Sequence, residues 1–348
     1  MAVDQRLVRL LSRRAWTSTL YYLLFNRGFG REHRAVLRGR VAFENSRRAQ
    51  LVTTSVLRRN THRIEKGLIM NPRRPLFGLS YIGETIQAYE RAARSIDDPD
   101  APSCLSELQW SHDVLERYFD CVTADPRIDA ARKRFQAASE ALPLDRQPAR
   151  AHKAPYRRDL EQGPAVSYEQ FLALSWRRRS VRWFAPRPVS RDLIHKAVAA
   201  ASLAPSACNR QPYYFHVFDA PDLVARISRL PPGTRGFDHQ FPVIIAVIGE
   251  LRNYYGERDR HLIYVDASLA VMNFVNAAET LGLASCCINW PDIEGFEARA
   301  VNELKLADDQ RPIMFLALGH PAPDGLVPYS QKKPLSGTCR FNFEEDDD

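Results

Sequence analysis

Three short apolar runs, separated by turn residues and by one long apolar segment, place the strongest limit on how this chain can fold. The runs span residues 213–218, 243–248 and 313–318, have the length of β-strands and are bounded by Pro, Gly or acidic residues. Between the last two, apolar residues recur at three-to-four spacing over several faces of residues 265–281, which predicts a helix buried on most sides. Strands and helices in this order indicate an α+β domain.

Two helices before the first run have clear start signals. Ser167 with Gln170 three residues later forms a capping-box pattern, which predicts a helix that ends near the arginine cluster at 177–179. Ser190 is the predicted N-cap of a second helix, which Pro205 stops.

The stretch 142–166 divides the 348-residue chain. It holds four prolines among charged residues, a composition typical of a linker. Apolar patterns before it are helical. We therefore expect a mainly helical, basic region of unknown role at 1–141, a linker at 142–166, the α+β domain at 167–343 and a solvated acidic tail at 344–348.

The net charge of +8 is concentrated at the front of the chain, where residues 1–70 contain fifteen Lys or Arg against four acidic residues. A solvated basic surface is favoured over one that binds lipid or small anions, and no motif indicates nucleic-acid binding. The apolar run at 15–25 is too short to cross a bilayer, which needs about 20 residues. It predicts a helix packed on the body or lying on a membrane surface as a peripheral contact.

Six cysteines without a CxxC pair indicate reduced thiols in the cytoplasm and no zinc site. Cys286 and Cys287 are interpreted as core thiols on a strand. In the front half, His62, Glu65 and Lys66 would share a helix face, where a His-Glu pair can transfer protons or bind an anion. A solvated helix end closed by Gly67 is the favoured interpretation.

The cluster Arg178, Arg179, Ser180 and Arg182 supplies guanidinium and hydroxyl donors suited to a phosphate, although a solvated basic helix end explains such a cluster more often. The segments that surround this cluster in the sequence favour the phosphate site instead. The segments 178–184, 204–213, 266–288 and 317–335 resemble the nitroreductase family in order and spacing, over about residues 167–342. The resemblance implies an α+β, nitroreductase-like fold with a central, mainly antiparallel sheet flanked by helices, preceded here by a helical extension.

The resemblance also implies an FMN site. Arg178 and Ser180, with Arg179 beside them, are expected at the FMN phosphate, and Arg182 near N1 and O2 of the flavin. Lys332 takes the position of a C-terminal arginine at the phosphate. Three residues of one loop would contact the flavin from a partner subunit, Pro205, Ser206 and Asn209, and Ala207 of the same loop is also expected at the cofactor. Backbone amides of three others would approach flavin N5: Ile288, Asn289 and Trp290.

Three positions depart from the family pattern. Lys332 replaces the usual arginine, which keeps the charge but loses bidentate geometry. Cys208 stands where glycine is common, and Asn289 with Trp290 where residues are often small, so we expect a narrower, reshaped pocket floor.

By the same resemblance, hydride passes from NAD(P)H through FMN to a small conjugated, nitro, quinone or ene acceptor in a ping-pong cycle, with no catalytic side chain. A homodimer is expected, with the helix at 265–281 as a candidate contact, although a core helix within one chain fits that pattern equally well. The choice between NADH and NADPH stays open. The alternatives are a flavin oxidase or dehalogenase on the same fold and a non-catalytic flavin-fold scaffold at a membrane or biosynthetic complex. Similar extensions are associated with polysaccharide biosynthesis.

Overall fold

The computed structural model describes residues 5–26, 28–48, 51–99, 101–102, 104–145 and 153–342, with side chains from residue 8 onward. The acidic tail predicted at 344–348 lies outside these residues, as does part of the predicted linker. The rest of that linker, 142–145 and 153–166, carries neither helix nor strand.

A four-stranded antiparallel sheet forms the centre of the second half, as expected. Its strands lie in the order β1 (Tyr213–Phe218), β2 (Val243–Glu250), β4 (Gln310–Gly319), β3 (Ala284–Asn289). The two central strands are almost wholly buried, which explains their continuous apolar sequences. β1 and β3 are the edges of the sheet.

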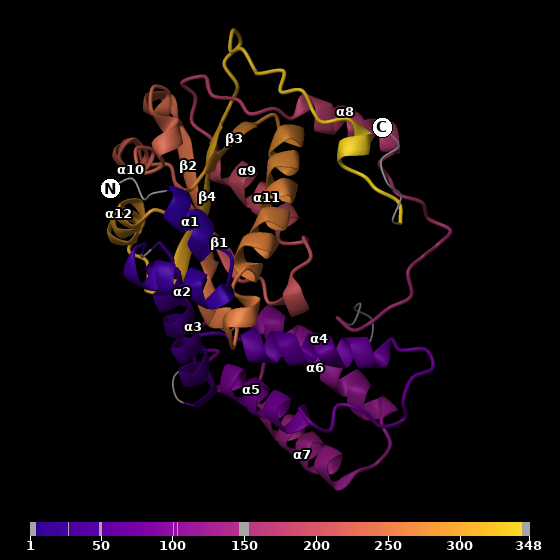
Figure 1. Cartoon of the computed structure of the whole chain (residues 1–348). Coiled ribbons are helices and arrows are strands. Elements are labelled where there is room, and N and C mark those ends of the chain that lie inside the picture. Colours follow the sequence, from indigo (N-terminus) through magenta and orange to yellow (C-terminus); the bar gives the residue numbers. More distant parts are fainter. Residues whose placement is uncertain are drawn as a thin grey trace.

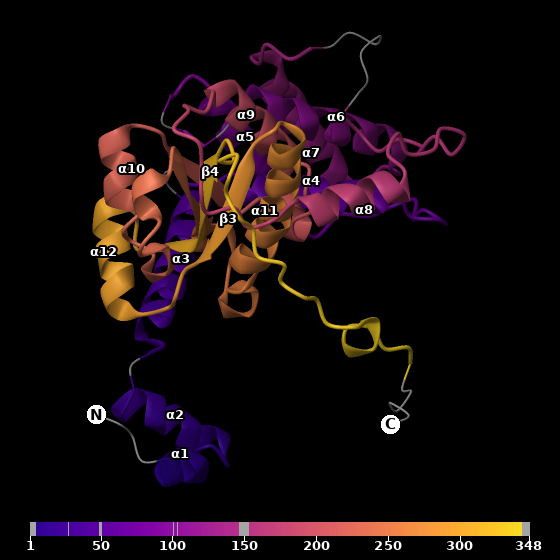
Figure 2. The ribbon, with the colours of Figure 1, turned by 90° about the horizontal axis from the view of Figure 1, so that it is seen from above.

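Helices cover both faces of the sheet (Figure 2). On one face lie α9 (Arg191–Ala201) and the central α11 (Leu262–Thr280), and on the other lie α10 (Pro221–Ile227) and α12 (Glu294–Leu304). The long predicted helix is therefore α11, and it begins three residues earlier than its periodicity indicated. Short 3-10 helices link the elements: η1 (Ala207–Asn209), η2 (Pro232–Thr234), η3 (Asp238–Gln240), η4 (Leu251–Asn253), η5 (Glu257–Asp259) and η6 (Leu335–Gly337).

Both predicted helix starts are confirmed. Ser167 accepts from the Gln170 backbone and Gln170 reaches back to Ser167, which completes the capping box of α8 (Tyr168–Arg177). Ser190 accepts from the backbone N–H of Asp192 at the start of α9. These local bonds fix where each helix begins, because they satisfy backbone N–H donors that have no partner within the helix.

Four helices of the extension build a core of their own beside the lower end of α11 (Figure 1). They are α4 (Ser55–Leu68), α5 (Ile82–Arg94), α6 (Leu105–Cys121) and α7 (Pro126–Glu140). Tyr89, Tyr118 and Ile86 are fully buried in this core. α4 ends at Leu68, one residue after Gly67, so a helix end is found where it was expected, but Gly67 itself is the penultimate helical residue and does not have the left-handed backbone of a terminating glycine. A Cβ at Gly67 would lie 2.2 Å from a ring carbon of Phe77, so close packing explains the glycine.

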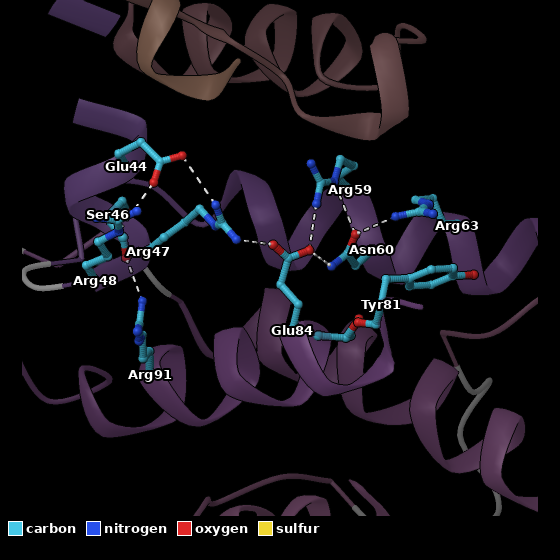
Figure 3. A network of polar contacts seen from close by, with 11 residues as sticks. Glu44, Ser46, Arg47, Arg48, Arg59, Asn60, Arg63, Tyr81, Glu84 and Arg91 are labelled. Atoms are coloured by element: carbon cyan, nitrogen blue, oxygen red, sulfur yellow. Dashed lines mark hydrogen bonds and ion pairs between the residues drawn. The ribbon is translucent and has the colours of Figure 1, made fainter. Parts of the chain in front are cut away.

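A polar network joins α3 (Gly30–Arg48) to this helical core (Figure 3). Glu84 on α5 forms an ion pair with Arg47 at 3.0 Å and accepts a hydrogen bond from Arg59 at 2.8 Å. Arg91 donates to the backbone carbonyl of Ser46 at 3.1 Å. The carboxylate of Glu84 thus neutralises two arginines that would otherwise repel one another.

The same α3 also packs on the sheet domain. Ala35 and Val36 belong to the core on the α11 face of the sheet, and Gly39 approaches the backbone of Leu251 so closely that a Cβ would lie 2.9 Å from its carbonyl carbon. Arg31 pairs with the buried Glu297 of α12 at 3.1 Å. Helix α3 therefore contacts both the core of α4–α7 and the sheet domain.

The first two helices, α1 (Gln5–Leu11) and α2 (Ala15–Leu24), stand apart from the body (Figure 2). The Thr17 hydroxyl donates to the Leu11 carbonyl at 2.6 Å and holds the hairpin together. No residue of α2 is buried. Among the described helices, none combines the length and apolar character needed to traverse a bilayer.

Candidate functional site

The chain that leaves α8 runs along the outer edge of β3. Ser180 forms a bridge with Ser285, and the Val181 N–H donates to the Ser285 carbonyl at 3.0 Å. Further on, Phe184 bridges Pro321 at the end of β4. The predicted arginine cluster is thus fixed at an edge strand by backbone bonds.

Two of the cluster's cationic side chains, those of Arg178 and Arg182, form no ion pair with the described residues. The Nε of Arg178, near Cys287, is buried without a partner among the described residues. Such an unpaired buried donor is costly unless a ligand completes it. Arg182 lies over the Phe237 ring, 5.8 Å from its centroid. Burial raises the pKa of the Cys286 thiol, while the Arg182 charge and the Ser180 hydroxyl beside it act in the opposite direction.

The other two predicted phosphate ligands have different surroundings. Arg179 donates to the backbone carbonyls of Pro328 and Tyr329, so it holds the C-terminal arm and has fewer donors left for a phosphate. Lys332 lies exposed on that arm, and no contact in the described part of the chain joins it to Arg178.

The free edge of β3 presents backbone donors next to this cluster. The Ser285 carbonyl points away from β4, and backbone groups in a strand alternate in direction, so those of Cys287 and Asn289 also point outward. Ile288 faces β4 instead. Of the three residues predicted at flavin N5, Asn289 therefore has the outward amide.

The side chain of Trp290 does not narrow the pocket, contrary to the expectation from its size. It is buried against Phe315, with ring centroids 5.3 Å apart, and its indole N–H donates to Glu297 at 2.6 Å. Cys287 is exposed, so only Cys286 is the core thiol that the sequence led us to expect for both.

The loop predicted to touch a flavin lies at the far end of α11. Its Ala207 N–H donates to Asp266 in the second turn of that helix at 3.0 Å, and the Tyr254 hydroxyl donates to the same carboxylate at 2.9 Å. Burial raises the pKa of Asp266, and these two hydrogen bonds lower it. Pro205 is exposed, and Ser206, Ala207 and Asn209 are half-buried.

Within one chain the loop and the arginine cluster are far apart. Arg177, next to the cluster, pairs with Glu279 in the last turn of α11 at 2.9 Å, whereas the loop is held at Asp266. Thirteen residues of helix separate these contacts, which is roughly 20 Å at 1.5 Å per residue. The structure does not bring the two halves of the predicted site together in a single copy.

The loop has a second anchor that sequence reasoning missed. Arg58 of α4 donates from Nε to the Asn209 carbonyl at 2.7 Å and from Nη2 to the Gln211 side chain at 2.9 Å. No local pattern distinguishes this arginine from its basic neighbours, because its partners are about 150 positions away.

The predicted polar face of α4 is formed in part. The His62 ring lies 3.3 Å from Glu65, and Glu65 also accepts from the Trp110 indole at 3.0 Å. Lys66 is exposed. The second bond to Glu65 gives this carboxylate a structural role between α4 and α6.

A four-stranded antiparallel sheet, a central buried helix and an arginine cluster at the free edge strand define the nitroreductase-like class of α+β proteins. The model of the Nitroreductase family matches residues 176–231 and 229–320. A protein of Archaeoglobus fulgidus, provisionally named an NADH dehydrogenase/NAD(P)H nitroreductase, is 30% identical over 158 residues, which cover 44% of this chain and 86% of that protein. The chain belongs to the nitroreductase family.

Other proteins are similar to part of this chain. Iodotyrosine deiodinase 1 of Sus scrofa is 23% identical over 199 residues, covering 48% of this chain and 66% of the deiodinase, just under two thirds. CLA biosynthesis enone reductase of Lactiplantibacillus plantarum is 32% identical over 98 residues, covering 26% of this chain and 44% of the reductase. A solved FMN-dependent nitroreductase from Clostridium difficile has a TM-score of 0.43 and 21% identity, covering 49% of this chain and 99% of that one.

Proposed function

We propose that this protein is an FMN-dependent oxidoreductase that takes hydride from NAD(P)H and delivers it to a small conjugated, nitro, quinone or ene acceptor. The observation that carries the proposal is the cluster at the free edge of β3, where Arg178 has a buried, unpartnered Nε beside Ser180 and Arg182. Bound FMN would supply the hydride chemistry, since none of the residues at the cluster is an activated nucleophile.

The chain's own groups would bind and orient the cofactor. Arg178 and Ser180 offer a charged donor and a hydroxyl suited to a phosphate. Arg182 would place positive charge where the reduced flavin carries negative charge, which favours reduction. The outward amide of Asn289 would serve the flavin edge as a donor fixed by the strand.

We propose that the protein works as a homodimer. α11 exposes an apolar stripe made by Val265, Leu269 and Met272, with 51%, 43% and 43% of their surfaces exposed. Packing two such helices antiparallel about a two-fold axis would bury both stripes. It would also bring the Asp266 end of one copy, with its loop, to the Arg178 end of the other.

The test is direct. Purified protein should be yellow, and mass spectrometry of the released cofactor should identify FMN. Anaerobic stopped-flow mixing with NADH or NADPH should bleach the flavin, and the faster donor identifies the preferred nucleotide. Colourless protein that takes up no FMN would contradict the proposal and would favour the scaffold alternative.

Reductive dehalogenation is the second candidate, favoured by four relatives that carry the name iodotyrosine deiodinase. The experiment compares turnover of 3-iodotyrosine with turnover of a quinone and a nitroarene by the dithionite-reduced holoenzyme. Iodide release faster than reduction of the other two acceptors would select the dehalogenase.

We also propose that the α1–α2 hairpin binds an anionic membrane surface from the cytoplasmic side. Trp16, Leu23 and Leu24 are each about 60% exposed. Arg9, Arg13 and Arg14 form no ion pair among the described residues, whereas Arg31, Arg34, Arg38 and Arg40 of α3 are all paired with carboxylates of the body. Unpaired cations beside exposed aliphatic and indole groups fit an anionic bilayer better than a second, equally cationic hairpin.

In a flotation assay, vesicles of phosphatidylglycerol should carry the wild type upward, whereas a variant with Trp16→Ser and Leu23→Ser should stay behind unbound. Equal flotation of both, or self-association through the hairpin without vesicles, would contradict membrane binding. The cytoplasmic location is consistent with six free cysteines. The link to polysaccharide biosynthesis stays a prediction.

A further inference from the structure

The loop between α9 and β1 has an unusual backbone. Cys208, Asn209 and Gln211 have φ angles of 54°, 53° and 48°, in the left-handed region that residues other than glycine rarely adopt. Conformations of this kind persist only where surrounding contacts hold them. Three such residues within four positions therefore need strong anchors.

The sheet domain anchors the loop at its start and again near its end, where the Gln211 side chain donates to the Ser202 carbonyl at 3.0 Å. Asp266 holds the Ala207 N–H at 3.0 Å, and the Ser206 hydroxyl accepts from the Gln211 N–H at 3.1 Å. None of these bonds engages the carbonyl of Asn209, the second of two successive left-handed residues. That carbonyl is held from outside the domain.

Arg58 of α4 provides the missing anchor. It contacts two of the three left-handed residues, through the Asn209 carbonyl at 2.7 Å and the Gln211 side chain at 2.9 Å. Its side chain is 18% exposed, so solvent screens these charged bonds only partly.

Arg58 is itself held rigidly by α6. Its Nη1 lies 3.5 Å from Glu107, whose side chain is 6% exposed, and its guanidinium lies over the Trp110 ring at 5.5 Å. Burial raises the pKa of Glu107, and the Arg58 charge lowers it. A continuous set of contacts thus runs from the core of the helical extension to the loop.

We infer that Arg58 is a positioning residue through which the helical extension holds the 205–211 loop in the conformation that binds flavin. This role rests on the proposed flavin site. It assigns a task to α4–α7, namely to stabilise a loop conformation that the sheet domain holds through Ala207, Arg210 and Gln211 but not through the Asn209 carbonyl.

The experiment uses the full-length protein with Arg58→Met, which keeps an unbranched apolar stem but removes the donors, and with Arg58→Lys. The control is Arg91→Met, which also removes an arginine-to-carbonyl bond, between α5 and Ser46 and away from the loop (Figure 3). Apo protein is titrated with FMN. Hydrogen exchange is measured at the amides of Ala207 and Gln211.

In Arg58→Met, we expect FMN to bind about tenfold more weakly, as for the loss of one charge-assisted hydrogen bond, and both amides to exchange faster. Lysine can reach one acceptor but not both, so the FMN affinity of Arg58→Lys should lie between those of the wild type and Arg58→Met. Arg91→Met should match the wild type in FMN binding and in exchange at the loop.

A lower melting temperature in Arg58→Met with FMN affinity within twofold of the wild type would overturn the inference, because Arg58 would then be only a structural tether. Unchanged exchange at both amides would overturn it too. If the wild type binds FMN and Arg58→Met binds it equally well, only this inference fails. If the wild type binds no FMN, the proposed function fails as well.

Discussion

Removing Arg178 gives the sharpest test of the flavin site, because this side chain makes no hydrogen bond from Nε to the described protein. Arg178→Ala should therefore leave the folded chain without a lost partner. Its cost should be confined to the ligand, at about 1.5–3 kcal/mol for one charged hydrogen bond to a phosphate. That is roughly a 10- to 150-fold increase in the Kd for FMN, measured by quenching of flavin fluorescence on titration of apo protein.

The neighbouring Arg177 provides the matched control. Arg177→Ala removes an ion pair of 2.9 Å with Glu279, but the arginine side chain is 75% exposed, so its loss should cost less than about 1 kcal/mol of stability. FMN affinity should not change. An Arg178→Ala protein that binds FMN within twofold of the wild type would refute the phosphate assignment, and so would equal weakening in both variants.

Three further predictions concern assembly, packing and pH. Met272→Asp should place a charge in the proposed two-fold contact and give monomers by light scattering, with weakened FMN retention. Leu160→Asp, on an exposed part of the predicted linker, should stay dimeric, and a dimeric Met272→Asp protein would contradict the α11 interface. Gly319→Ala would bring a Cβ to 2.6 Å from Pro242 and should lower the unfolding free energy by about 1–3 kcal/mol in a urea titration, whereas Gly295→Ala meets no atom within 4 Å and should not destabilise. Burial lowers the pKa of His216 in the folded protein, so near the ordinary pKa of histidine the unfolded chain binds more protons than the folded one. The free energy of unfolding should therefore fall as the pH drops from 7.5 to 5. His216→Gln should make this dependence on pH less steep, and an unchanged dependence would contradict the assignment.

Elements defined by local signals were predictable. The capping box at Ser167, the N-cap at Ser190 and the strand at 213–218 depend on residues within a few positions of each other, and all three were placed correctly. The antiparallel sheet followed from the family resemblance and is confirmed.

Features set by distant partners could not be predicted. Trp290 was expected to narrow the pocket because of its size. Its buried acceptor, Glu297, lies in the following helix, and the residues next to Trp290 do not indicate that contact. Cys286 and Cys287 looked alike because one residue of difference decides which face of an edge strand a side chain takes. Arg58 looked like one of many solvated arginines, since no residue near it in the sequence indicates Asn209 as its partner.

The contact of α3 with the sheet domain has a practical consequence for dissecting the chain. A protein fragment that starts at Ser167 would satisfy the boundary visible in the sequence, yet it would leave bare the apolar surface that Ala35 and Val36 cover and the backbone of Leu251 that fits against Gly39. It would also leave Glu297 as a buried carboxylate without Arg31. Such a fragment should aggregate, whereas one that starts at Gly30 would keep the cover in place.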